Sequence, residues 1–117
     1  MNKYVAIFCI PADGVKEWMA TVDEGTRKEQ SDNVMKEWAT WMEMNKEAIV
    51  DAGLPLGKTK RALKDSVSDV TNDMNWFMVV QAESHDAAAA LVQSNPHLQM
   101  IPSSYADIMD ANHMGGM

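Results

Sequence analysis

The sequence predicts one small α+β domain in which two helices pack on one face of a mostly antiparallel sheet. Its 117 residues are 46% hydrophobic and 23% charged, which is typical of a single globular domain. Strand and helix patterns alternate along the chain, and the two clearest strands are apolar on both faces. We therefore expect one domain over residues 1–111, followed by a flexible tail at 112–117.

The first half of the domain is expected to be a strand followed by a long helix. Residues 3–10 are mostly β-branched or aromatic and end at the turn sequence Pro11-Ala12-Asp13-Gly14, so they predict a strand. Residues 15–20 predict one or two helical turns. An apolar period of 3.6 residues predicts a long helix over 28–52, with Gly53 as its C-cap.

The second half is expected to contain a hairpin, a strand, a helix and a last strand. Residues 57–64 and 67–71 predict the short polar hairpin, and 74–82 form the clearest strand after the first. A helix is expected over 84–94, because its first residue is a serine typical of an N-cap. The last strand is expected at 104–109. This order, with both helices on one face, is that of a ferredoxin-like split βαβ sheet.

Both faces of the expected sheet are apolar, which predicts a second covering layer besides the helices. Alternation along the two clearest strands divides their apolar side chains into two sets. The first strand places Tyr4, Ala6, Phe8 and Ile10 on one face and Val5, Ile7 and Cys9 on the other. The later strand places Trp76, Met78 and Val80 on one face and Phe77 and Val79 on the other. A patch of that size rarely stays exposed. We expect a homodimer through this face, with a covering loop from residues 11–27 as the alternative.

Composition argues against several classes of partner. The net charge of −7 disfavours nucleic acid, and the basic residues Lys58, Lys60, Arg61 and Lys64 are expected to form a solvated strand edge. The single cysteine, Cys9, cannot form an internal disulfide. No apolar stretch approaches the roughly 20 residues that a membrane span needs. We therefore expect a cytoplasmic protein that binds neither nucleic acid nor membranes.

A ligand pocket is expected beneath the long helix. Trp38 and Trp41 lie three residues apart on its apolar stripe, either as core or as the wall of a pocket for a flat or apolar ligand. Asn45 interrupts the same stripe, so it either lines the pocket or faces a wet gap or caps a local hydrogen bond. Asp51, at the expected helix end, is either compensated by a nearby cation or bonded to the turn backbone. Tyr105 could give the pocket a polar group.

His97 is the candidate catalytic residue. A histidine titrates near neutral pH and can carry a proton, although a histidine that caps the end of a helix is the alternative. The three histidines are scattered, and no H-x-x-H, C-x-x-C or E-x-x-H pattern is present, so no metal site is expected. The P-loop, G-x-S-x-G and G-x-G-x-x-G motifs are also missing from the sequence, and no cofactor is expected.

From the long helix onward, residues 34–110 resemble the YCII-related proteins. The resemblance rests on Trp38-Ala39-Thr40-Trp41-Met42, the run from Ala48 to Gly57 with Lys60, the run from Val79 to Ala88, Asn95-Pro96-His97-Leu98, and Ile108-Met109. It implies a ferredoxin-like α+β fold whose sheets pair as a dimeric α/β barrel. Some family members carry a His/Asp pair proposed as an active site, with the histidine near the start of the long helix. This chain has Gln30, Asn33 and Val34 in that region, so the pair is not carried over whole.

Two function hypotheses follow from these observations. The first is a small-molecule-binding domain for an apolar or aromatic ligand, which the pocket residues and the incomplete acid/base set favour. The alternative is a cofactor-independent enzyme, such as an isomerase, a lyase or a monooxygenase-like protein, with His97 as proton carrier. The enzyme hypothesis requires His97 to face the same cavity as Trp38, Asn45 or Tyr105.

Overall fold

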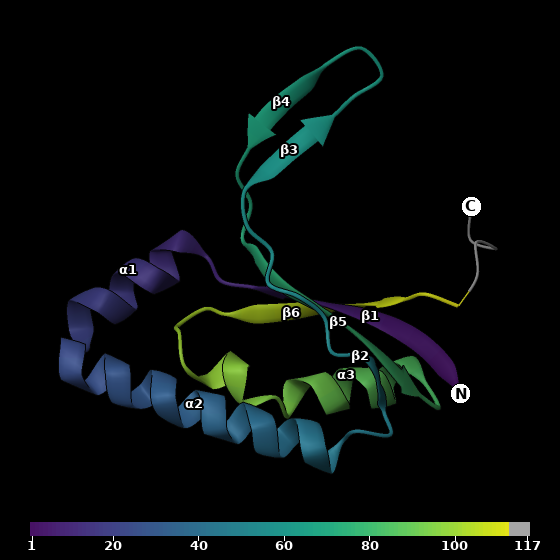
Figure 1. Cartoon of the computed structure of the whole chain (residues 1–117), viewed down its shortest axis with the longest axis horizontal. Coiled ribbons are helices and arrows are strands. Elements are labelled where there is room, and N and C mark those ends of the chain that lie inside the picture. Colours follow the sequence, from purple (N-terminus) through teal and green to yellow (C-terminus); the bar gives the residue numbers. More distant parts are fainter. Residues whose placement is uncertain (113–117) are drawn as a thin grey trace.

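A four-stranded antiparallel sheet lies at the centre of the structure, a computed structural model that describes residues 1–112 (Figure 1). Its strands are β1 (Asn2–Cys9), β2 (Ile49–Asp51), β5 (Met74–Ala82) and β6 (Tyr105–Asp110). They lie in the order β2-β5-β1-β6, and each neighbouring pair runs antiparallel. The tail expected at 112–117 falls, beyond its first residue, outside the described residues.

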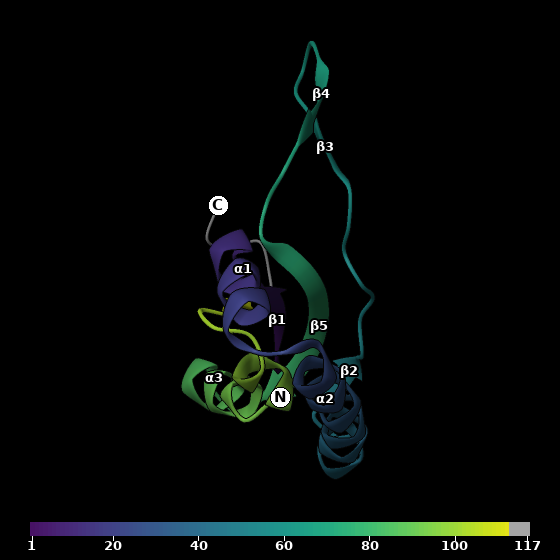
Figure 2. The same cartoon turned by 90° about the vertical axis from the view of Figure 1, so that its left-hand side faces the viewer.

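Helices α2 (Glu24–Met44) and α3 (His85–Gln93) cover one face of this sheet. Helix α1 (Ala12–Thr21) follows β1, and the short 3-10 helix η1 (Pro96–Gln99) follows α3. Both views of the molecule show α2 and α3 on the same side of the sheet (Figures 1 and 2). The predicted fold class, α+β with a ferredoxin-like antiparallel sheet and two helices on one face, is confirmed. Among residues 1–112, no helix has both the length and the apolar character to cross a membrane.

The core fills the space between the sheet and these two helices. Strand register places Ala6 opposite both Met78 and Ile108, and Tyr4 opposite Val80. The buried apolar side chains are those of Tyr4, Ala6, Phe8, Trp41, Met78, Val80, Ala82, Ala88 and Val92. The strand residues among them belong to one predicted alternation set of β1 and one of β5, and the register brings these two sets to the same face. On the opposite face Val5, Ile7, Phe77 and Val79 are only half-buried.

The long helix was expected over 28–52, but α2 both begins and ends earlier, at Glu24 and Met44. It begins after Asp23, whose carboxylate accepts a hydrogen bond of 2.8 Å from the Thr26 amide. It ends before Asn45, and residues 49–51 form the edge strand β2 instead, with Ile49 opposite Val80. The β-branched pair Ile49-Val50 finds unpaired backbone on β5, so strand pairing overrides the helical period there.

The two segments flanking the long helix also differ from expectation. Residues 11–27 form α1 and the start of α2, where the sequence predicted only one or two turns or a covering loop. The predicted hairpin exists as β3 (Thr59–Ala62) and β4 (Val67–Val70), but it forms a separate two-stranded sheet. Figures 1 and 2 both show this hairpin projecting on the side opposite to α2 and α3. The fourth strand of the main sheet is β2 and not a strand of the hairpin, because β2 is the segment that pairs with β5.

Candidate functional site

A small cavity lies where α2, β5 and η1 meet. Its volume is about 130 Å³, and it is lined by Val34, Met35, Trp38, Trp76 and His97. Its walls are almost entirely apolar, with the imidazole of His97 as the titratable group. Apolar walls with one polar group are the usual composition of a small-molecule site.

Each element supplies its side chains to the cavity for a local reason. Val34, Met35 and Trp38 lie three and four residues apart, so they share one face of α2. Trp76 stands near the start of β5, and its indole nitrogen donates a hydrogen bond of 2.9 Å to the carbonyl of Ala52. His97 lies in the first turn of η1, where its backbone N–H donates to the side-chain oxygen of Asn95 at 2.8 Å.

Aromatic rings enclose the imidazole. The centroid of the Trp38 ring lies 5.7 Å from that of His97 and 5.7 Å from that of Trp76, in both cases edge to face. The ring of Phe8 lies 6.1 Å from that of Trp38 and 6.3 Å from that of His97, also edge to face. Separations and angles of this kind are favourable for aromatic pairs and hold each ring in one orientation.

The environment of His97 keeps its ring neutral. Burial lowers the pKa of His97 below its ordinary value of 6.5, because the charged form is poorly solvated among apolar rings. Its Nε2 lies 3.3 Å from the side-chain nitrogen of Asn75, which donates to it when the ring proton is on Nδ1. Within residues 1–112 no hydrogen-bond partner is recorded for Nδ1. The ring therefore offers one nitrogen for hydrogen bonding with a ligand.

This pKa shift predicts a specific pH dependence of stability. Because the folded-state pKa lies below 6.5, the unfolded chain takes up a proton first as the pH falls. The stabilisation is therefore present above pH 6.5, decreases below it, and stops decreasing once the pH is under the folded-state pKa. Urea unfolding from pH 8 to pH 5 should show wild type losing stability relative to His97→Gln, by at most about 1.4 kcal/mol per pH unit. A constant difference between the two proteins would contradict this account.

Three other residues of the predicted site have structural contacts instead. Trp41 is buried, and its indole nitrogen donates a hydrogen bond of 2.8 Å to the hydroxyl of Ser94, which ties α2 to α3. Asn45 caps α2, since its side-chain nitrogen donates to the carbonyl of Trp41 at 2.8 Å. Asp51 lies at the end of β2, where its carboxylate accepts a hydrogen bond of 2.8 Å from the Gly53 amide. This is the turn contact that the sequence left open for Asp51, although the turn follows a strand and not a helix.

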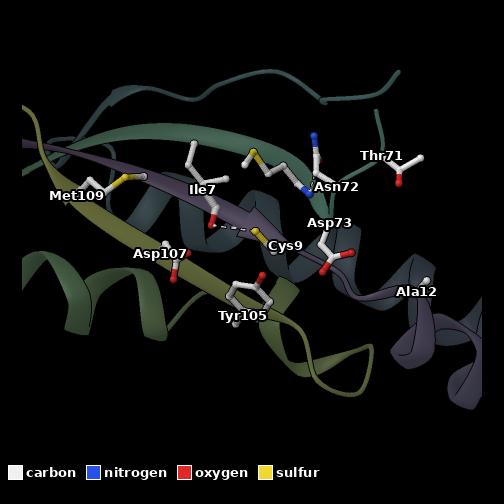
Figure 3. A pocket seen from close by; sticks show the side chains of 10 residues that line it. Ile7, Cys9, Ala12, Thr71, Asn72, Asp73, Tyr105, Asp107 and Met109 are labelled. Atoms are coloured by element: carbon white, nitrogen blue, oxygen red, sulfur yellow. Dashed lines mark hydrogen bonds between the residues drawn. The ribbon is translucent and has the colours of Figure 1, made fainter. Parts of the chain in front are cut away.

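Tyr105 lies on the other face of the sheet, away from His97. It borders an open hollow of about 630 Å³, whose remaining lining residues are Ile7, Cys9, Ala12, Thr71, Asn72, Asp73, Met74, Asp107 and Met109. Figure 3 shows Tyr105 beside Cys9, with Asp73 and Asp107 nearby. This hollow is larger than the cavity at His97 but opens on the half-buried apolar face.

The titratable groups of this hollow are poorly suited to acid/base chemistry near neutral pH. Burial raises the pKa of the Cys9 thiol, and the Asp107 and Asp73 carboxylates add to the effect, while a hydrogen bond with Tyr105 opposes it. That hydrogen bond to Cys9 also raises the pKa of Tyr105. Both groups are therefore protonated at neutral pH, and a thiol in that form is a weak nucleophile. We place the candidate site at His97 for this reason.

Sequence reasoning placed Trp38 and His97 in one site but missed the other cavity residues. Val34 and Met35 could have been predicted from helical spacing, since both lie on the same face of α2 as Trp38. No sequence pattern places Trp76 or Asn75 there, because β5 reaches α2 only through the packing of the sheet. Among the described residues, no cluster of three or more histidine, cysteine or acidic side chains is arranged to hold a metal ion.

Comparisons with known proteins give one structural likeness. No protein-family model and no curated protein matches the chain. A solved structure with a similar fold is 5-chloro-2-hydroxyhydroquinone dehydrochlorinase (TftG) from Burkholderia phenoliruptrix AC1100, in complex with 2,5-dihydroxybenzoquinone. The likeness has a TM-score of 0.50 and 15% sequence identity, and it covers 97% of each chain. At this identity it shows a shared fold alone.

Proposed function

We propose that this chain is a small-molecule-binding domain of the YCII-related type, whose ligand lies in the cavity beside His97. The observation that carries the proposal is a neutral imidazole that packs against Trp38 and Phe8 and borders a cavity of about 130 Å³, which Trp38 and Trp76 also line. An apolar cavity of about 150 Å³ is large enough for benzene. The cavity beside His97 is slightly smaller but partly open to solvent, so it suits the edge of a single aromatic or quinoid ring, with an oxygen substituent directed at the imidazole.

The structural neighbour is consistent with this ligand class. Its complex contains 2,5-dihydroxybenzoquinone, which is one planar ring carrying oxygen atoms. Flat rings stack well on tryptophan, and an oxygen substituent can exchange a hydrogen bond with a neutral imidazole. We extend that ligand class to this chain because of the aromatic walls and the imidazole and not because of sequence identity.

A dimer through the bare sheet face is part of the same proposal. Its central side chains, Val5, Ile7, Phe77 and Val79, are apolar and only half-buried. Register places Val5 between Val79 on β5 and Met109 on β6, so the apolar surface runs across three strands. The same face of a second copy would cover it, as in a dimeric α/β barrel.

Ligand binding can be tested by the indole N–H signals of the four tryptophans in a ¹H–¹⁵N NMR titration. Hydroquinone and 2,5-dihydroxybenzoquinone are the probes. The signals of Trp38 and Trp76 should shift, whereas that of Trp18, whose indole donates to Gln30 and does not line the cavity, should not. Trp38→Leu should weaken binding about tenfold, because one stacking wall is lost.

The matched control for this titration is Trp18→Phe, which should leave the affinity unchanged. If only the signals of residues around Tyr105 and Cys9 shift, the ligand binds in the hollow on the other face of the sheet. The absence of any indole shift at millimolar probe would reject a site for single-ring ligands beside His97.

A second candidate is a cofactor-independent enzyme of the isomerase, lyase or monooxygenase-like kind, with His97 as proton carrier. The specific observation in its favour is that Asn75 holds one nitrogen of a neutral ring while the other has no recorded partner within residues 1–112. Nδ1 can accept a proton from a bound substrate when the ring proton is on Nε2 and the Asn75 amide is turned so that its oxygen accepts from Nε2–H. Catalysed deuterium exchange into the ring carbons of dihydroxybenzoquinone, lost in His97→Gln with binding retained, would support it; exchange unchanged in His97→Gln would reject it.

A further inference from the structure

We propose that the projecting hairpin, residues 58–70, is an arm that grips the acidic helix layer of a second copy of this chain docked on the bare sheet face. This inference rests on the proposed dimer and adds a second contact surface to it. Hereafter these residues are called the arm.

The position of the arm is the first observation. It leaves the sheet beside β5, where Pro55 bridges to Trp76 and the Leu56 amide donates to the Asn75 carbonyl at 2.9 Å. Figures 1 and 2, at right angles to each other, both show the arm on the side of the sheet opposite to α2 and α3. That is the side of the bare face, so a molecule docked on this face lies beside the arm.

The arm is well formed but makes few contacts with its own domain. Its strands pair from Thr59 opposite Val70 to Ala62 opposite Val67, and Lys60 forms an ion pair of 2.7 Å with Asp69. Leu63 and Val67 leave 62% and 67% of their surface exposed. An isolated two-stranded hairpin is only marginally stable in water. A partner surface would therefore stabilise the arm as well as cover its apolar side chains.

The length of the arm decides which part of a second copy it would meet. Extended chain advances about 3.3 Å per residue, so the segment from Leu56 at the sheet edge to Ala62 at the end of β3 spans up to roughly 20 Å. Sheets packed face to face lie about 10 Å apart, and a helix is about 10 Å across. The arm is thus long enough to pass the sheet of the second copy and reach its helix layer.

Charge makes that helix layer a complementary surface. The arm carries Lys58, Lys60, Arg61 and Lys64 against two carboxylates, a net charge of +2. Since the whole chain has a net charge of −7, the remaining residues carry −9. The α2 helix carries five carboxylates against three cations, a net charge of −2; the carboxylates, all exposed, are those of Glu24, Glu29, Asp32, Glu37 and Glu43. A basic arm against an acidic surface favours association, and two-fold symmetry uses both arms at once.

Cross-linking of isotopically mixed dimers tests the contact directly. Full-length ¹⁴N and ¹⁵N proteins are mixed and treated with a carbodiimide, which joins lysine amines to carboxylates in contact. We expect mass spectra in which an arm peptide of one isotope, linked through Lys58 or Lys64, is joined to an α2 peptide of the other isotope. A dimer by sedimentation whose arm lysines link only within their own chain would overturn the arm contact and leave the sheet-face dimer standing.

Failure of the dimer is distinguishable from failure of the arm. A protein that sediments as a monomer up to about 100 µM, above the range of a stable dimer, would overturn both the arm contact and the dimer. The indole titration measures the cavity beside His97 independently, so that result would leave the ligand site untouched.

Charge reversal supplies a matched pair of variants. The arm variant combines Lys58→Glu, Arg61→Glu and Lys64→Glu, and it retains Lys60 so that the ion pair with Asp69 still holds the hairpin. The comparison variant combines Lys16→Glu, Lys28→Glu and Lys36→Glu, with the same change in net charge. Since Lys28 and Lys36 lie on α2, this variant makes the proposed contact surface more acidic and should not loosen the arm. The arm variant should weaken the dimer about tenfold or more in low salt, and the comparison variant should not. Equal weakening by both variants would indicate general repulsion and overturn the proposal.

Discussion

Gly53→Ala is expected to destabilise the protein by about 2–4 kcal/mol, because glycine alone fits the backbone there. Gly53 has a φ of +87°, and an added Cβ would lie 1.5 Å from the carbonyl oxygen of Phe77. The same Cβ would be 2.9 Å from the indole nitrogen of Trp76. Relieving these overlaps requires β2 to move away from β5, which also breaks the bond from Trp76 to Ala52.

Gly57→Ala is the matched control for this change. Gly57 lies four residues further along the same connection, and an added Cβ would meet no atom within 4 Å. Its effect should stay within about 0.5 kcal/mol. Urea unfolding of both variants, followed by tryptophan fluorescence, measures the difference. Equal stabilities of the two variants would mean that the close approach of Gly53 to the Phe77 carbonyl on β5 does not contribute to the free energy of unfolding.

Val5→Lys is expected to abolish the proposed dimer at concentrations where wild type is dimeric. Val5 stands at the centre of the bare face, with Val79 and Met109 as its cross-strand neighbours. Two-fold symmetry would bring two ammonium groups into one apolar interface, and each costs several kcal/mol to bury unpaired. We expect the dissociation constant to rise at least about a thousandfold, which corresponds to about 4 kcal/mol.

The folded monomer should tolerate this change, because Val5 is only half-buried within one chain. Met19→Lys is the control: it places the same charge on α1, at a side chain that is 57% exposed. Sedimentation equilibrium of the three proteins, with circular dichroism to confirm folding, gives the result. If Val5→Lys dimerises as strongly as wild type, the bare sheet face is not the interface.

The effect of Gly53→Ala can also be followed at the cavity beside His97, because Trp76 lines that cavity. Trp76 is held by the Ala52 carbonyl, and the same short connection continues into the arm through Leu56. The wall of the cavity and the base of the arm are therefore neighbouring parts of one segment. Indole signals in the Gly53→Ala variant should report whether that segment keeps Trp76 in place.

Local pattern was sufficient to predict the fold class and most strands. Alternation grouped Tyr4, Ala6 and Phe8 on one face of β1, and Met78 and Val80 on one face of β5, and the structure buries each of these residues. The serine before α3 caps that helix as expected, since its side chain accepts a bond from the Ala87 amide. These features depend on residues close in the chain, so periodicity and turn chemistry are enough to predict them.

Tertiary contacts decided the remaining features. The segment 49–51 continues the helical period, but an open edge of β5 was available and made it a strand. Trp38 and Trp41 look equivalent on the helix, yet only Trp38 faces His97, because the chain after α3 turns back beside it. Tyr105 and His97 were placed in one pocket by sequence, whereas the sheet lies between them. Which residues share a cavity depends on the packing of distant segments, and a single sequence carries no direct record of that packing.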